Sequence, residues 1–238
     1  MAHVLESHTC LTAWRDATNY ILQNGDGGNL LVRVSNPLTF TEAELLSLYA
    51  TGAQNKQDVM DVTNTIFPYR LFKRSNGLSV QAFYDKHLAL YKRGKKLHTK
   101  NKSKWGNYFL RFTSFGKDGK NQLQNIIDRI NERAKKYSAC YMMHVSSPDL
   151  DNNTRNMANP CLQYVQFEQQ GKTINMTAVY RNHDFNTKAL GNYIGLSRLL
   201  EFVCDQTGCN VGSLTCHSIH YYLKNQRSVK AAIALLPW

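Results

Sequence analysis

The sequence lacks any run of about 18 consecutive apolar residues, the length that a membrane-spanning helix needs. It also lacks a basic segment followed by an apolar one at its N-terminus, so no secretory signal is expected. No internal repeat or low-complexity stretch is present, and the six cysteines form no Cys-x-x-Cys pair. These absences predict a cytoplasmic chain with reduced thiols, no membrane span and no disulfide framework.

Acidic residues are scarce relative to basic ones. The 238 residues include 29 Lys and Arg but 17 Asp and Glu, which gives a formal net charge of +12. Such a charge favours nucleic acid or phosphorylated small molecules as partners. Basic residues are densest within 92–104, which predicts either a solvated loop or one that collects phosphate. No RRM, KH or helix-turn-helix signature accompanies this segment, so sequence-specific reading of nucleic acid is not supported.

Hydrophobic residues make up 42% of the chain, enough for a packed core in one large domain or two joined ones. Apolar periodicity and turn signals predict interspersed helices and strands, so the fold class is α/β of the α+β type. A capping box from Thr41 to Glu44 opens one of the helices. The expected helices are 11–23, the one that begins at 41–46, 121–134 and 192–206; the expected strands are 30–34, 105–115, 141–145, 162–169 and 173–181.

Cys161 is the candidate nucleophile. It follows Pro160 at the end of an Asn-rich loop, and Arg181 ends the next predicted hairpin. A guanidinium beside a thiol lowers its pKa and favours the thiolate, the form that attacks carbon. The alternative is a buried, inert thiol, which is the commonest fate of a cysteine.

A second group of cysteines and histidines lies near the C-terminus, from Cys204 to His220. Its C-x4-C-x6-C-H-x2-H spacing fits no usual zinc pattern. Cys204 also falls beside Phe202 and Val203 on a helix face, where a thiol packs as a small apolar group. No metal site is therefore predicted.

Several short motifs together resemble the thymidylate synthase family. That family carries P-C-H-x-x-x-Q-F, then R-S-x-D, an Asn eight residues after the Asp, and H-x-Y. The same order and spacing occur here in Pro160-Cys161, Gln166-Phe167, Arg181, Asp184, Asn192 and His220-x-Tyr222. The resemblance covers roughly 105–223, whereas 1–104 match only loosely, through Glu44-Leu45-Leu46. It implies a single thymidylate-synthase-like domain over 1–238, a mixed sheet flanked by helices, with 1–104 as a divergent N-terminal part and 105–223 as the motif-bearing core.

The resemblance also implies a reaction. Cys161 would add to C6 of a pyrimidine nucleotide, so that C5 can attack a one-carbon unit from methylene-tetrahydrofolate. Asn192 would read O4 and N3–H of a uracil ring, because an amide can both donate and accept; cytosine-specific relatives carry Asp there. Arg181 would hold the phosphate as a bidentate fork.

Four further positions complete the implied site. His220 and Tyr222 would bond the sugar hydroxyl, Asp184 would bind the pterin of the folate, and Asn182 replaces a Ser beside the phosphate arginine. Simpler readings stay open: Arg181 as a surface residue, Asn192 as a helix N-cap, and His220-Tyr221-Tyr222 as a plain strand.

The chain departs from the family pattern at several places. Leu162 replaces the His after the nucleophile, and Trp105-Gly106 replaces Tyr-Gly, with Tyr108 as a candidate substitute. Ser138-Ala139-Cys140 stands where the family has Ser-Arg-Arg, whose two arginines reach the phosphate site of the partner subunit. We expect Lys or Arg residues of 92–104 to supply those phosphate contacts instead. Sixteen residues follow Tyr222, fewer than in the C-terminal part that closes over folate in the family. We therefore expect a more open site, which would admit water and favour hydroxymethylation.

Three functional hypotheses follow. The first is C5 hydroxymethylation or methylation of a uracil-type nucleotide. The second is a non-catalytic nucleotide-binding relative, and the third is a basic nucleic-acid-binding protein that uses 92–104. We also expect a twofold homodimer with sheets packed face to face, because 141–145 and 162–167 carry apolar residues on both faces.

Overall fold

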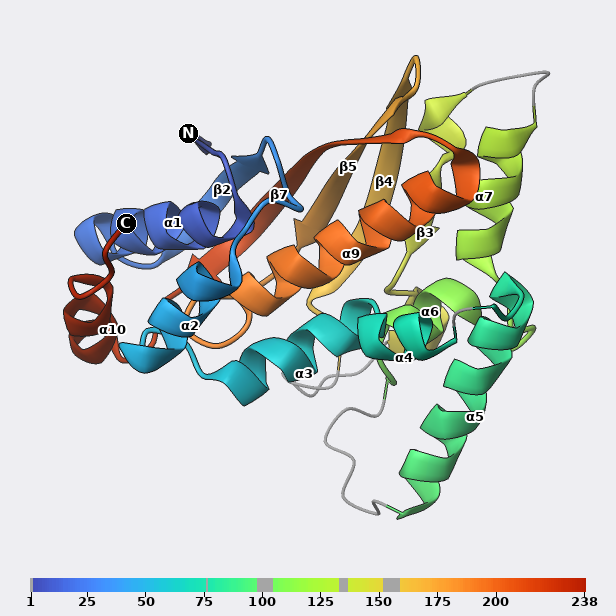
Figure 1. Ribbon diagram of the computed structural model, residues 1–238, viewed down its shortest axis with the longest axis horizontal. Helices are drawn as coiled ribbons and strands as arrows, with labels where there is room; N and C mark the ends of the chain where they lie inside the picture. The colour runs from blue at the N-terminus through green and yellow to red at the C-terminus, as the bar shows by residue number, and fades with distance from the viewer. Residues whose placement is uncertain (1, 76, 98–104, 133–136, 152–158) are drawn as a thin grey trace.

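The computed structural model describes every residue except 1, 76, 98–104, 133–136 and 152–158 (Figure 1). The strands are β1 His3–Ser7, β2 Gly27–Val34, β3 Met142–His144, β4 Leu162–Gln170, β5 Thr173–Tyr180, β6 His183–Asp184 and β7 Asn210–Tyr222. The helices are α1 Cys10–Asn24, α2 Glu42–Ala50, α3 Lys56–Ile66, α4 Tyr69–Arg74, α5 Val80–Leu97, α6 Tyr108–Thr113, α7 Gln122–Asn131, α8 Pro148–Asp151, α9 Ala189–Thr207 and α10 Gln226–Ile233, with a 3-10 turn, η1, at Ser138–Cys140.

The strands form one mixed sheet in the order β1-β2-β7-β5-β4-β3, and the short β6 pairs with the end of β7. β5 and β7 run parallel, while β4 and β5 form an antiparallel hairpin. The α/β class and the mixed sheet are confirmed. The register places Leu162 opposite Tyr180 and Tyr180 opposite Ser218. The start of β4, the end of β5 and the last residues of β7 therefore meet at one end of the sheet.

Local signals fix several element boundaries as predicted. The capping box at Thr41 and Glu44 is present and opens α2. The hairpin between β4 and β5 turns at Gly171, whose φ of 60° is the left-handed conformation that glycine adopts without strain. α7 begins after Asn121, whose side chain caps the helix, and its four buried Leu and Ile residues lie on one face.

The predicted strand at 105–115 is wrong, because Tyr108–Thr113 form helix α6. The side chain of Asn107 accepts a hydrogen bond from the Leu110 amide and caps the helix. Phe109 and Phe112, three residues apart, then both enter the core with no exposed area. The aromatic residues that favour a strand in isolation are used here at helical spacing.

The basic segment at 92–104 is not simply a loop. Residues 92–97 continue α5 to its end, and 98–104 lie outside the described residues. The expected phosphate-collecting role of this segment therefore stays a prediction. Of the helices that the structure describes, none combines the length and the apolar composition that crossing a membrane takes.

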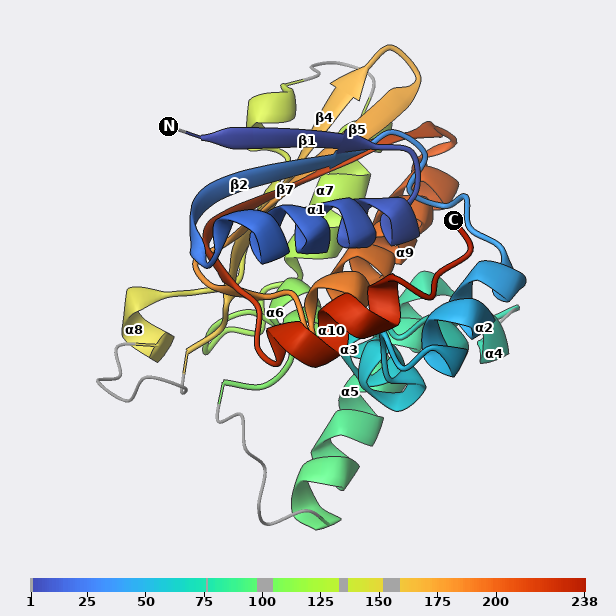
Figure 2. The ribbon, with the colours of Figure 1, turned by 90° about the vertical axis from the view of Figure 1, so that its left-hand side faces the viewer.

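The two faces of the sheet differ. α1 and α9 run along one face (Figure 2), and alternate strand residues such as Val32, Ala178 and Val165 are fully buried there. Apart from Val179, which is buried, the residues of the opposite face are half-buried or exposed, and they include Met142 with 38% and Ile219 with 45% of their surface exposed. The β3 strand is thus buried on one face, through Met143, and open on the other in the single chain.

Helix α3 crosses α9 at two glycines. A Cβ atom built on Gly191 would lie 2.7 Å from the Cβ of Val62, and one on Gly195 would lie 2.9 Å from the Cβ of Ile66. Real Cβ atoms do not come that close, so only glycine allows the two helices to pack at this separation. Thr63 adds a hydrogen bond of 3.2 Å from its hydroxyl to the Gly191 carbonyl.

Candidate active site

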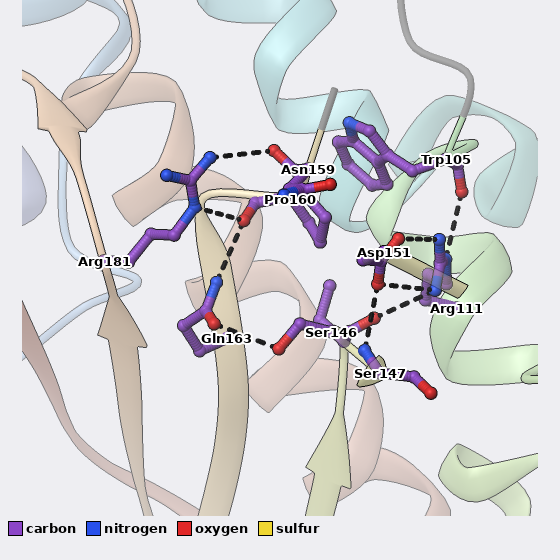
Figure 3. A network of polar contacts seen from close by, with 10 residues as sticks. Trp105, Arg111, Ser146, Ser147, Asp151, Asn159, Pro160, Gln163 and Arg181 are labelled. Atoms are coloured by element: carbon purple, nitrogen blue, oxygen red, sulfur yellow. Dashed lines mark hydrogen bonds and ion pairs between the residues drawn. The ribbon is translucent and has the colours of Figure 1, made fainter. Parts of the chain in front are cut away.

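Cys161 and Arg181 lie side by side at the end of the sheet where β4 begins and β5 ends. The Arg181 amide donates to the Cys161 carbonyl at 2.9 Å. The guanidinium donates from Nε to the Pro160 carbonyl at 3.0 Å and from Nη2 to the Asn159 carbonyl at 3.2 Å (Figure 3). Arg181 thus holds three successive carbonyls of the segment that carries the thiol, which fixes the main chain around the candidate nucleophile.

The Cys161 thiol is half-buried, and its pKa is raised above the ordinary value of 9.0. Burial is the largest cause, because it disfavours the charged thiolate. The positive charge of Arg181 lowers the pKa, as the sequence predicts, but less than burial raises it, and Asp184 raises it further. Burial therefore outweighs Arg181 at the thiol, contrary to the expectation that the guanidinium holds a thiolate at neutral pH.

Tyr108 brings a phenol to the same place from α6. Its Oη accepts a hydrogen bond of 3.4 Å from the Leu162 amide, directly after Cys161. Burial raises the pKa of Tyr108, and the neighbouring Cys161 raises it as well, so the hydroxyl keeps its proton at neutral pH. The indole of Trp105 lies against this ring with centroids 4.8 Å apart.

A cavity of about 450 Å³ opens beside Arg181. Gln163, from β4, crosses its wall: Nε2 donates to the Pro160 carbonyl at 2.9 Å, and Oε1 accepts from the Ser146 hydroxyl at 3.0 Å (Figure 3). Gln163 belongs to none of the motifs that the chain shares with the family, although a polar side chain two residues after a candidate nucleophile is a usable signal in the sequence. The other lining residues are Ser147, Pro148, Asp151 and Asn159.

A buried ion pair supports the far wall of this cavity (Figure 3). Both nitrogens at the tip of Arg111 meet the carboxylate of Asp151, the shorter contact being 2.8 Å, and the two side chains are 8% and 6% exposed. Arg111 also donates to the Trp105 and Val145 carbonyls. The pair joins α6 to the end of α8. No pattern in the sequence pointed to it, because the partners stand 40 residues apart.

Asn192 lies in the first turns of α9 and is 4% exposed. It is not the N-cap, because the helix begins at Ala189 after Lys188, so that alternative is wrong. Its Nδ2 lies 3.0 Å from Nε2 of His183, whose Nδ1 lies 2.8 Å from the Ser218 hydroxyl. In the sequence motif His183 occupies only the variable position between Arg181 and Asp184.

The remaining predicted residues line the ends of β6 and β7. His220 is exposed, and its Nδ1 lies 2.7 Å from Oδ1 of Asn182. Tyr222 pairs with Asp184 in the sheet register. The Asp184 carboxylate accepts from the amides of residues 186 and 187 and from the Thr187 hydroxyl, which shapes the turn into α9. His220 and Tyr222 do belong to a regular strand, and both are accessible to solvent in part.

The C-terminal cysteines do not gather with the histidines. Cys204 and Cys216 are buried, and the Cys204 thiol donates to the Asn210 carbonyl. In the described part of the chain, no three His, Cys, Asp or Glu side chains converge on a position that could hold a metal ion.

Comparison with known proteins relates this chain to one family. The family model described as thymidylate synthase matches residues 44–236. A protein of Methanothermobacter marburgensis named "Putative thymidylate synthase" is 32% identical over 111 residues, which cover 45% of this chain and 49% of the relative. Proteins with the same name from Methanococcoides burtonii and Methanosarcina barkeri are 29% and 28% identical, over 44% and 43% of this chain and 48% and 45% of their own lengths. The aligned part spans about half the length of these curated relatives.

Proposed function

The chain belongs to the thymidylate synthase family, and from this premise we propose that it transfers a one-carbon unit to C5 of a uracil nucleotide, with Cys161 as the nucleophile. The observation that carries the proposal is the contact between Arg181 and the three carbonyls of residues 159–161. Arg181 lines the cavity and is held next to Cys161, in the order and spacing of the family's motifs. A purely structural cysteine would not need this charge beside it.

Arg181 is placed to bind a phosphate as well as the main chain. A guanidinium carries five N–H donors, and within the described residues two of its side-chain donors are used on carbonyls. Three donors are left for a phosphate in the adjoining cavity, where Ser146 and Ser147 add further polar groups. His220, held by Asn182, and Tyr222 would bond the sugar hydroxyl.

Because the pKa of Cys161 is raised, the thiol has to be deprotonated after the substrate binds. The thiol must lose its proton before the sulfur can form a bond to C6 of the ring. Addition of the thiolate moves the C5–C6 π electrons toward C5 and O4, and C5 then attacks the one-carbon unit. Loss of the C5 proton and departure of the carrier amine would leave an exocyclic carbon that takes up hydride, giving methyl, or water, giving hydroxymethyl. Cleavage of the S–C6 bond would then restore the ring and a thiolate, which regains its proton.

Tyr108 fits a role in the proton transfers, because its hydroxyl is protonated and contacts the main chain next to Cys161. A protonated phenol cannot act as a base by itself, so it would orient a water or pass a proton along. Trp105, which stands in place of the family's tyrosine, has no hydroxyl for this purpose. Tyr108 is therefore the substitute that the structure favours.

Methylene-tetrahydrofolate would supply the one-carbon unit when bound. Asp184 fits the expected contact with its pterin, because a carboxylate has about four acceptor positions and three are used by the turn at residues 186–187. One position is left for a donor on the cofactor. The product, methylated or hydroxymethylated, is decided by the experiment below.

A twofold homodimer fits the one-sided sheet. Helices cover one face, whereas Leu31, His217, Val179 and Tyr164 form a row across the other at matching register positions. Packing a second copy on this face would bury the exposed apolar residues Val4, Met142 and Ile219. Light scattering at micromolar concentration should give twice the chain mass, and a monomer would contradict the proposal.

The test of the reaction is covalent trapping. The protein is incubated with 5-fluoro-dUMP and methylene-tetrahydrofolate and its intact mass is measured. An adduct that depends on both compounds is expected, and Cys161→Ser should abolish it, whereas Cys140→Ser, at an exposed cysteine, should keep it. With dUMP, the product mass then distinguishes methyl from hydroxymethyl transfer. Nucleotide binding without an adduct would instead support the non-catalytic hypothesis, and binding of nucleic acid alone would support the third.

A further inference from the structure

The side-chain amide of Asn192 contacts His183, a histidine to which none of the family motifs gives a role. Asn192 Nδ2 can only donate a hydrogen bond, so His183 Nε2, 3.0 Å away, must accept. The proton of the ring then lies on Nδ1, which donates to the Ser218 hydroxyl at 2.8 Å. The chain from Ser218 through His183 to Asn192 therefore has one consistent direction of donation.

The surroundings of His183 keep the ring in this state. It is 1% exposed, it stacks on Tyr180 with centroids 4.2 Å apart, and the edge of Tyr193 meets it at 5.9 Å. No carboxylate among the described residues contacts the ring, since the neighbouring Asp184 side chain turns to the amides of 186 and 187. Burial lowers the pKa of His183 to about 3, so the ring is neutral at physiological pH and its Nε2 can accept.

We infer that His183 is the positioning residue that fixes the Asn192 amide in the orientation that reads uracil and rejects cytosine. If the amide turned over while the ring kept its proton on Nδ1, its Oδ1 would face the lone pair of Nε2, and two acceptors would be in contact. The amide is thus left with one N–H and one carbonyl oxygen in a fixed order. Uracil offers N3–H and O4, while cytosine offers the opposite order, an N3 acceptor and an N4 donor. The inference rests on the proposed function, because it takes Asn192 as the residue that reads the base.

This arrangement also accounts for Leu162. The residue after the nucleophile is fully buried and apolar here, so it can give no polar support to a base. The support comes instead from His183 and Ser218, which lie in the neighbouring strands β6 and β7. A base-reading amide needs such a fixed partner, because a free amide can turn over at little cost and lose discrimination.

The first test measures the ring itself and needs no substrate. Two-dimensional ¹⁵N–¹H spectra of the whole protein report which ring nitrogen carries the proton. The expected signal for His183 is that of the neutral Nδ1–H form, assigned by its loss in His183→Phe. A neutral ring protonated on Nε2, or a charged ring at neutral pH, would overturn the inference.

The second test measures discrimination, as kcat/KM for dUMP divided by that for dCMP. Ser218→Ala removes the acceptor for Nδ1–H, which frees the ring to move its proton to Nε2 and lets the Asn192 amide turn over. We expect this ratio to fall by about tenfold or more, in line with the loss of one buried hydrogen bond to a polar group. His183→Phe, which keeps a ring in the stack, should lower it similarly.

Ser197→Ala is the matched control. Ser197 is also fully buried, but its hydroxyl bonds to the Tyr193 carbonyl and Cys10 rather than to the His183 ring. This variant should leave the ratio unchanged. If Ser218→Ala and His183→Phe also leave it unchanged while the fluorinated adduct still forms, His183 does not position the amide. If the unaltered protein forms no adduct, the proposed function fails, and the spectra still decide the geometry.

Discussion

Acidification should destabilise this protein through His183 in a way that one variant isolates. The folded-state pKa of His183 is about 3, below the ordinary histidine value of 6.5, because the charged ring would be buried among aromatic side chains. The unfolded chain takes up a proton near pH 6.5 and the folded chain does not. Stability that is present above pH 6.5 is therefore lost as the pH falls toward 3.

The size of the effect follows from one proton. Between about pH 6 and about pH 4 the unfolded state binds nearly one more proton at this position, and each pH unit changes the free energy of unfolding by about 1.4 kcal/mol. The loss attributable to His183 over this interval is thus about 2.5 kcal/mol. A lowered pKa of about 4 at His87 acts in the same direction over most of the interval.

The assay is urea unfolding, followed by circular dichroism at fixed protein concentration, over this pH range. In His183→Phe the free energy of unfolding should fall by about 2.5 kcal/mol less than in the unaltered protein between the two pH values. His87→Phe should also flatten the dependence, which separates the two histidines. Parallel pH profiles for the unaltered protein and His183→Phe would refute the reasoning, because they would mean that the ring is charged or solvated in the folded state.

Three further outcomes are expected. The rate at which iodoacetamide alkylates Cys161, measured by peptide mass spectrometry, should rise with pH to a midpoint above the ordinary thiol pKa. Arg181→Gln should move that midpoint higher. A midpoint below the ordinary pKa would contradict the dominance of burial. Tyr108→Phe should lower kcat by about 100-fold or more with little change in KM, while covalent trapping persists; equal loss of both would indicate a binding role. Asp151→Ala should lower the free energy of unfolding by about 3–5 kcal/mol, because it leaves Arg111 buried without its carboxylate; a loss below about 1 kcal/mol in urea unfolding would show that solvent reaches the pair.

Sequence patterns predicted the elements whose signals are local. The hairpin at Gly171, the capping box at Thr41 and the periodic helix after Asn121 each depend on residues within a few positions of one another. The segment at 105–115 failed because its conformation is decided by distant partners. Phe109, for example, packs on Phe67, directly after α3, and on Phe83 of α5, and that contact selects the helix over the strand.

In the candidate site, too, the sequence predicted the motif residues but not the contacts that depend on the fold. The family motifs located Cys161 and Arg181, and the structure brings these two residues together. They could not reveal that burial outweighs the guanidinium at the thiol, since that balance depends on how deeply β4 lies in the fold. Nor could they reveal the contact between His183 and Asn192, because a helix and a strand end must first be packed together.

Under the proposed function, the glycine crossing of α3 over α9 lies where it can affect the choice of base. Gly191 immediately precedes Asn192, and its missing side chain lets Val62 of α3 press against the backbone of α9. Gly191→Ala would force the two helices apart and shift Asn192 along or away from His183, without altering any group that touches the nucleotide. Variation at this contact could therefore tune which pyrimidine is accepted, so a search for altered specificity belongs at a helix crossing as much as in the pocket.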